Sequence, residues 1–542
     1  MKVFPVVERE LRAASRRRGT YWVRFVAAAV AIIIAAWILL LTRESGQSDQ
    51  ISKSIFISLS IFAFIYCLFA GVRNTADCVS EERREGTLGL LFLTDLKAFE
   101  VLFGKLAATS LNSLYGLVAI FPVLALPLLL GGMTLEQYGV MLLVLLNTLF
   151  LSLAAGLCIS TFVQGERAAM SLTVALMTFL CVGWGIMGWL LIERLLGLSG
   201  QAEQWWTEAV FGWVSPIYGF AELLDSLDQA KISDNVWVSL LVGHITAWLL
   251  VFIAQWKLPR IWQDKADTIR GLQWKQRWKL WSHGTSAQRF SYRSKLLDES
   301  PTFWLGSRNR LKPVIVWGVL GILGMLWLWG LVENPNDWMD EGVHIITGLI
   351  LTTVLKIWLA IEAAHRFNHD RQSGALELLL STPLEVSEII RGQFQALKRQ
   401  FLWPTMLVLV VHFLFILSEK ASGGIVTWWL GAMAMLVADM FAISYIGMWL
   451  GLNNRYATRA SGATLARVLV LPWLMIIGFF TFIALVGRFA SWGRFENLFI
   501  TIWLMAGLGV NLFFGLRAWH GLQEKLRDLA ASRFDAVGSM KG

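Results

Sequence analysis

Charge is scarce in this sequence: only 16% of its 542 residues are Asp, Glu, Lys or Arg, whereas 56% are hydrophobic. Soluble globular domains carry about 25% charged residues, so water is not the main solvent of this chain. Cysteine is also rare, and the four residues, Cys67, Cys78, Cys158 and Cys181, indicate no disulfide framework. The sequence contains no Gly-x-x-x-x-Gly-Lys-(Ser/Thr) phosphate loop. We therefore expect no nucleotide-binding domain in this chain, and no enzyme activity of its own.

What the sequence does have is long apolar runs. About 20 apolar residues suffice for a helix to cross a membrane. Six such segments lie in the first half, near 20–42, 52–73, 105–130, 138–163, 168–198 and 236–256. Six more lie near 313–332, 343–364, 400–417, 425–452, 464–487 and 497–518. The predicted fold is all-α: a polytopic membrane protein with about 12 transmembrane helices.

The net charge of +9 is concentrated beside these segments. Residues 257–312 are rich in Lys and Arg, interleaved with Trp274, Trp278 and Trp281. Basic residues and tryptophans at a membrane edge favour anionic headgroups, so the expected partner of this stretch is membrane lipid and not nucleic acid. The Lys/Arg bias also predicts that both termini are cytoplasmic, in an inner-membrane, multi-pass protein.

A segment of the first half recurs in the second half. Residues 80–96 match residues 368–384 through an acidic residue, an arginine, a glycine and two leucines, offset by 288 positions: Glu82, Arg83, Gly86, Leu88 and Leu91 against Asp370, Arg371, Gly374, Leu376 and Leu379. The match continues in register to Gly104-Lys105 and Gly392-Gln393. Such self-similarity predicts two parallel six-helix repeats that enclose a central cleft.

The repeat suggests a division of the chain into four parts. Residues 1–256 form a first six-span repeat with an N-terminal connecting helix. Residues 257–312 form a basic cytosolic linker and a second connecting helix. Residues 313–519 form the second six-span repeat, and residues 520–542 a cytosolic C-terminal tail.

The repeated segment has the properties of a short docking helix. Leucines three positions apart form an apolar stripe, and the glycine before them permits a bend. This pattern resembles the cytosolic segment after the second span in permeases of the type-2 ABC exporter family. The resemblance implies that a separate ABC ATPase, one or two subunits, docks on both segments. It also implies that ATP binds to the partner and that this chain needs no cofactor.

The function expected from this resemblance is that of an exporter permease, moving an unidentified substrate across the inner membrane. An ion-coupled secondary transporter and a non-transport membrane scaffold are the alternatives. Three polar residues within spans, Asp439, His412 and Asn147, are candidates for lining the cleft, and interhelical pairing is the other interpretation. Glu362, His365 and His369 share a helical face, for which we prefer a polar surface to a metal site.

Overall fold

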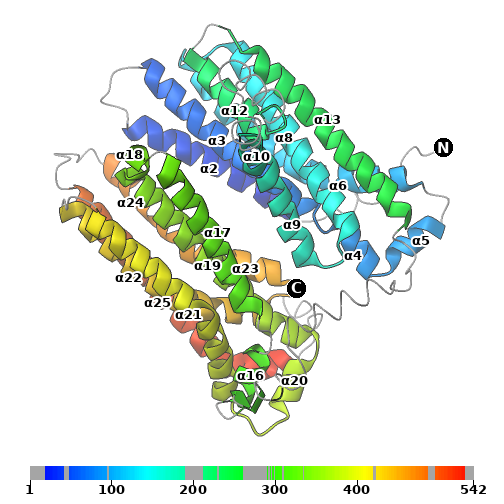
Figure 1. Ribbon diagram of the computed structural model, residues 1–542, viewed down its shortest axis with the longest axis vertical. Coiled ribbons are helices and arrows are strands. Elements are labelled where there is room, and N and C mark those ends of the chain that lie inside the picture. The colour runs from blue at the N-terminus through cyan, green and yellow to red at the C-terminus, as the bar shows by residue number, and fades with distance from the viewer. Residues whose placement is uncertain are drawn as a thin grey trace. The chain divides into compact units, whose positions relative to one another are not determined.

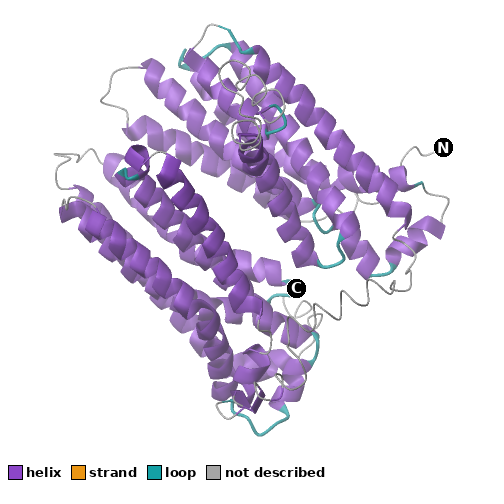
Figure 2. Ribbon diagram, viewed as in Figure 1, coloured by secondary structure: helices purple, strands orange, loops and turns teal. Residues whose placement is uncertain are grey.

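The computed structural model describes residues 19–41, 48–93, 97–189, 212–228, 231–260, 290, 293–294, 296–297, 300–307, 311–333, 335–418, 423–485 and 495–531. Every element in these ranges is a helix, which confirms the predicted fold class (Figure 2). The helices form two compact units, Met1–Ala266 and Asp267–Gly542. The predicted N-terminal connecting helix and most of the predicted basic linker lie outside the described residues.

The helices of the first unit are shown in Figure 1: α2 (Gly19–Leu41), α3 (Ser48–Asn74), α4 (Cys78–Arg84), α5 (Thr87–Leu93), α6 (Ala98–Leu124), α7 (Leu126–Leu129), α8 (Leu135–Phe162), α9 (Glu166–Thr178), η1 (Phe179–Gly183), α10 (Trp184–Trp189), α12 (Pro216–Asp225), η4 (Ser226–Asp228), α13 (Asp234–Lys257) and η5 (Leu258–Arg260). Helix α8 is buried along most of its length, between α3 and α13. Helices α3 and α8 pack closely, because a Cβ atom at Gly71 would lie 1.8 Å from Ser152 O.

The second unit contains α16 (Pro301–Ser307), α17 (Leu311–Glu333), α18 (Pro335–Trp338), α19 (Glu341–Gln372), α20 (Ala375–Leu380), α21 (Val386–Ser418), α22 (Gly423–Asn453), α23 (Ala457–Leu465), η6 (Ala466–Val470), α24 (Leu471–Leu485) and α25 (Phe495–Ala531). Helices α19 and α22 take the places of α3 and α8 in this unit. They also pack closely, since a Cβ atom at Gly451 would lie 2.1 Å from Ala364 O. The last helix continues past residue 519 to Ala531.

The order of elements repeats between the units. Helix α6 begins at Ala98 and α21 at Val386, which is the offset of 288 positions seen in the sequence. A π-helical turn interrupts the fifth long helix of each unit, at Phe179–Gly183 and at Ala466–Val470. Because π-helical turns are rare, their occurrence at matching places is strong evidence of a structural repeat.

Eleven helices within the described residues are long and apolar enough to cross a membrane. A twelfth apolar helix, Ala168–Gly183, is shorter than these, and residues 190–211 after its continuation in α10 lie outside the described part. The predicted polytopic layout is thus confirmed. Each unit has its own apolar core, the first around α3, α6 and α8, the second around α19, α21 and α22.

Candidate partner-docking site

The repeated motif forms a sharp bend in each unit. We call residues 78–93 the first corner and residues 365–380 the second corner. Gly86 has φ +73° and Gly374 φ +72°, both in the left-handed region that favours glycine. A Cβ atom at either position would meet no atom within 4 Å. Backbone conformation, and not lack of space, therefore requires glycine at both bends.

In the first corner the acidic residue of the motif ties the bend to α6. Lys105 Nζ, on α6, lies 2.6 Å from Glu82 Oε1. The Thr87 hydroxyl, just after the bend, donates to the same carboxylate and to Glu82 O at 3.2 Å. One carboxylate thus joins α4, α5 and α6.

The second corner repeats this connection with different chemistry. Gln393, which occupies the position of Lys105, donates from Nε2 to Asp370 Oδ2 over 3.4 Å. Glu100 and Glu388 also play matching parts, because each accepts the backbone N–H three residues earlier and so caps the following helix. Sequence analysis aligned Lys105 with Gln393 but did not recognise either as a partner of the acidic residue.

The arginine of the motif reaches the end of the next buried helix in both units. Arg371 Nη1 donates to Leu452 O, near the end of α22, over 2.6 Å. In the first corner, with the Gln164 amide oxygen turned toward Arg83, the Arg83 Nε donates to it over 3.0 Å. Gln164 lies just beyond the end of α8. Each corner is therefore connected to two helices of its own unit.

Leu88 and Leu376, two of the residues predicted to dock a partner, are buried within their own units. Leu88 is 2% exposed and Leu376 1% exposed, and each packs into the apolar core of its own unit. Leu379 is half-buried against the same core, and the side chain of Leu91 lies outside the described part. These leucines anchor the corner helices, because burying apolar surface in their own unit stabilises them there.

Other leucines of the corners are exposed. Leu90 and Leu93 on α5 are 63% and 75% exposed, and Leu378 on α20 is 72% exposed. Exposed leucines on a short, well-anchored helix provide the apolar contacts that a partner groove can cover. Leu88 and Leu376 lie on the same two short helices as these exposed leucines, but on the inner sides.

Asp439 does not line an open cleft. It is 1% exposed on α22, where Lys356 Nζ of α19 lies 2.6 Å from its Oδ2 and Asn511 Nδ2 of α25 donates to its Oδ1 over 2.6 Å. This arrangement matches the interpretation as interhelical pairing, since a buried carboxylate requires a cation and a hydrogen-bond donor. Sequence analysis missed Lys356, although a lysine within an apolar span is itself a signal.

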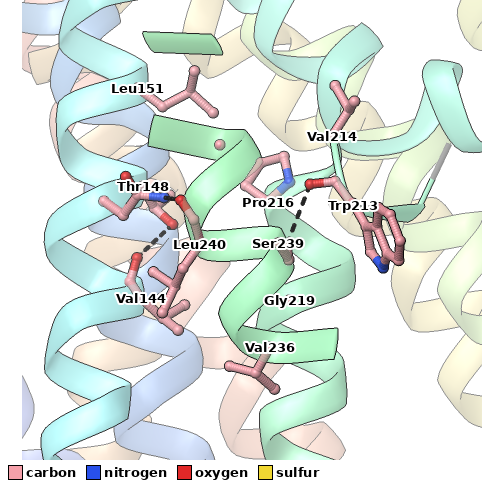
Figure 3. A pocket seen from close by; sticks show the side chains of 12 residues that line it. Val144, Thr148, Leu151, Trp213, Val214, Pro216, Gly219, Val236, Ser239 and Leu240 are labelled. Carbon is pink, nitrogen blue, oxygen red and sulfur yellow. Dashed lines mark hydrogen bonds between the residues drawn. The ribbon is translucent and has the colours of Figure 1, made fainter. Parts of the chain in front are cut away.

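The other two cleft candidates also lie between helices of one unit. His412 is 1% exposed, with its ring 5.0 Å from that of Trp429. Asn147 donates to Leu240 O over 3.0 Å and lines a cavity of about 20 Å³ between α8, α12 and α13 (Figure 3). That volume suits one water molecule, not a transported substrate.

Similarity to a known family covers nearly all of the first unit. Residues 6–256 match the model of the ABC-2 family transporter proteins. This segment belongs to the ABC-2 transporter family. The match supports a membrane permease component of an ABC transporter, a class in which the transmembrane part carries no ATPase domain of its own. No curated protein matches the chain.

Proposed function

We propose that this ABC-2 permease exports a substrate by using a separate ABC ATPase that binds both corners. The observation that supports this most directly is the pair of short helices, α5 and α20, which share a glycine bend, an inner leucine anchor and an exposed leucine. A partner that moves such a helix moves its attachments as well. For the first corner these are α6, through Glu82 and Lys105, and the end of α8, through Arg83.

The direction of transport and the substrate are expectations from the family resemblance. We place the protein in the inner membrane with both corners and both termini in the cytoplasm, where ATP is available to the partner. The ion-coupled alternative would use a membrane-embedded carboxylate that exchanges protons. Asp439 does not favour it, because Lys356 and Asn511 already satisfy that carboxylate.

The test is co-purification with a soluble ABC ATPase from the same organism. Leu90→Asp combined with Leu93→Asp, and separately Leu378→Asp, should each reduce ATPase retention about tenfold or more, since a central apolar anchor typically contributes at least that much. Leu135→Asp is the matched control, because Leu135 is 73% exposed at the start of α8, away from the corners. Retention unchanged in all corner variants contradicts the proposal.

A second measurement separates catalysis from binding. The purified chain in nanodiscs should hydrolyse no ATP above background until the ATPase is added. The corner variants should then lower the stimulated rate in proportion to retention. Vanadate-sensitive turnover by the chain alone would show that the ATPase is not a separate subunit.

A further inference from the structure

Two adjoining cavities lie beside α16, α17, α19 and α21 in the second unit. Their volumes are about 460 Å³ and 580 Å³, and both are lined by Gly306, Lys312 and Arg366. The first cavity extends toward the second corner, past His365, His369 and Asp370. The second cavity extends the other way, past Arg399, Trp317 and Trp403. Because they share Gly306, Lys312 and Arg366 in their linings, the two cavities adjoin between the second corner and the apolar part of the helices.

One buried residue, Arg366, lines both cavities. Arg366 is 7% exposed. Its Nε donates to Glu362 Oε1 and its Nη2 to Gln400 Oε1, both over 3.3 Å. Its Nη1 has no hydrogen-bond partner among the residues that the structure describes. Lys312 Nζ also bonds to Glu362 Oε1. One carboxylate thus contacts two cations, and the Arg366 Nη1 donor lies beside the cavities. Leaving such a donor unpaired is costly, so an anionic acceptor there is favourable.

The second cavity lies at the level where both flanking helices change from polar to apolar. On α21, Lys398, Arg399 and Gln400 are followed by an apolar stretch from Phe401 onward, and on α17 Lys312 is followed by a similar stretch. Trp317 and Trp403 are 44% and 68% exposed at this level. Tryptophans at such a boundary mark the membrane–water interface. The cavity therefore has a cationic end toward water and an aromatic end toward hydrocarbon.

We propose that this cavity binds the headgroup of an anionic phospholipid. The phosphate would lie among Lys312, Arg366 and Arg399, and an acyl chain would follow the Trp317 and Trp403 side, in the manner of basic pockets between membrane helices. Asp370 and Gln393 at the far end of the first cavity already bond to each other. The phosphate therefore belongs at the Lys312 end. Lys312, Arg366 and Arg399 lie on α17, α19 and α21, so this proposal does not use the exposed leucines of α5 and α20 on which ATPase docking is proposed.

The test is native mass spectrometry of the full chain, delipidated in detergent and titrated with phosphatidylglycerol or phosphatidylcholine. Arg399→Gln should weaken the first phosphatidylglycerol binding event about fivefold, which corresponds to about 1 kcal/mol, and Lys312→Gln with Arg399→Gln about thirtyfold. Phosphatidylcholine binding should not change in either variant. Lys398→Gln is the control, because Lys398 is exposed like its neighbour Arg399 but lies outside the cavity lining.

Three outcomes would overturn the proposal. One is equal first-site affinity of the native chain for both lipids. Another is a Lys398→Gln effect as large as that of Arg399→Gln, which would indicate nonspecific surface charge. The third is displacement of bound phosphatidylglycerol by millimolar inorganic phosphate, because the site would then recognise a free anion. A thermal unfolding curve of Arg399→Gln like that of the native chain shows that a lost binding event is not lost folding.

Discussion

Lys105 Nζ lies 2.6 Å from Glu82 Oε1, so an ion pair joins α6 to the first corner. The same place in the second corner has a neutral donor, Gln393, at 3.4 Å from Asp370. Both ion-pair side chains are largely buried, which increases the cost of removing one of them. The two corners therefore share a fold but differ in the strength and the charge of the bond that holds them.

We expect Lys105→Gln to lower the free energy of unfolding by about 2 kcal/mol, the typical contribution of a charge-assisted hydrogen bond. The measurement is denaturant unfolding in mixed micelles. Gln393→Lys is the reciprocal variant. It should stabilise the second corner, because a lysine at this position can form an ion pair with Asp370. A double-mutant cycle with Glu82→Gln isolates the pairwise contribution. A coupling energy near zero would mean that Lys105 acts elsewhere.

The left-handed bends should make glycine necessary at Gly86 and Gly374. Gly86→Ala or Gly374→Ala should cost about 1–2 kcal/mol, because a Cβ atom is unfavourable at this φ. Gly89→Ala is the control, since Gly89 lies within helix α5 and its Cβ would also meet nothing within 4 Å. Gly86→Asn should cost less than Gly86→Ala, as asparagine tolerates this conformation better. Equal stability of the alanine variants at 86 and 89 would contradict the structure.

Breaking the buried Lys356–Asp439 ion pair in the second unit should lower the free energy of unfolding more than Lys105→Gln does. Asp439→Ala leaves Lys356 without its carboxylate inside the helix bundle and should cost about 3–5 kcal/mol. Lys356→Met combined with Asp439→Leu should recover most of that loss, because two apolar side chains need no partner. Thermal aggregation of the three purified variants checks this order. A double variant as unstable as Asp439→Ala would mean that the aspartate has another essential role.

The predicted topology can be tested with cysteines at exposed positions. In a chain without its four native cysteines, Glu136→Cys and Glu341→Cys should react with an impermeant thiol reagent in intact cells. Glu85→Cys and Ser373→Cys, at the two bends, should react only after permeabilisation. All four positions are exposed, so burial does not explain a lack of reaction. Labelling of Glu85→Cys in intact cells would place the corners on the outer face.

The helices, the repeat and both bends could be predicted from sequence, because long apolar runs and a glycine-containing motif are local signals. The orientation of the corner helices could not. A spacing of three positions, as in Leu88 and Leu91, defines a face but does not say whether that face meets its own unit or a partner. Leu88 turned inward because α5 has a large core beside it, and Leu90 and Leu93 remained exposed.

Pairing between distant segments was also invisible in the sequence. Asp439 pairs with Lys356 on α19 and with Asn511 on α25, and only the packing of three helices brings these side chains together. The motif residue Glu82 finds Lys105 23 positions later, after a bend whose geometry fixes their distance. The π-helical turns could not be predicted either, because the residues in them are as apolar as the rest of the helix around them.

Because both corners lie in one chain, separate codons encode their residues, and this affects how the corners can evolve. In a transporter made from two identical subunits, one codon change alters both docking sites in the same way. The two sites of such a transporter cannot acquire different residues. Here Gly86 and Gly374, like Lys105 and Gln393, are encoded separately. Each corner is therefore free to vary alone, and an ion pair at one corner with an amide at the other is the kind of difference that two copies within a single gene permit.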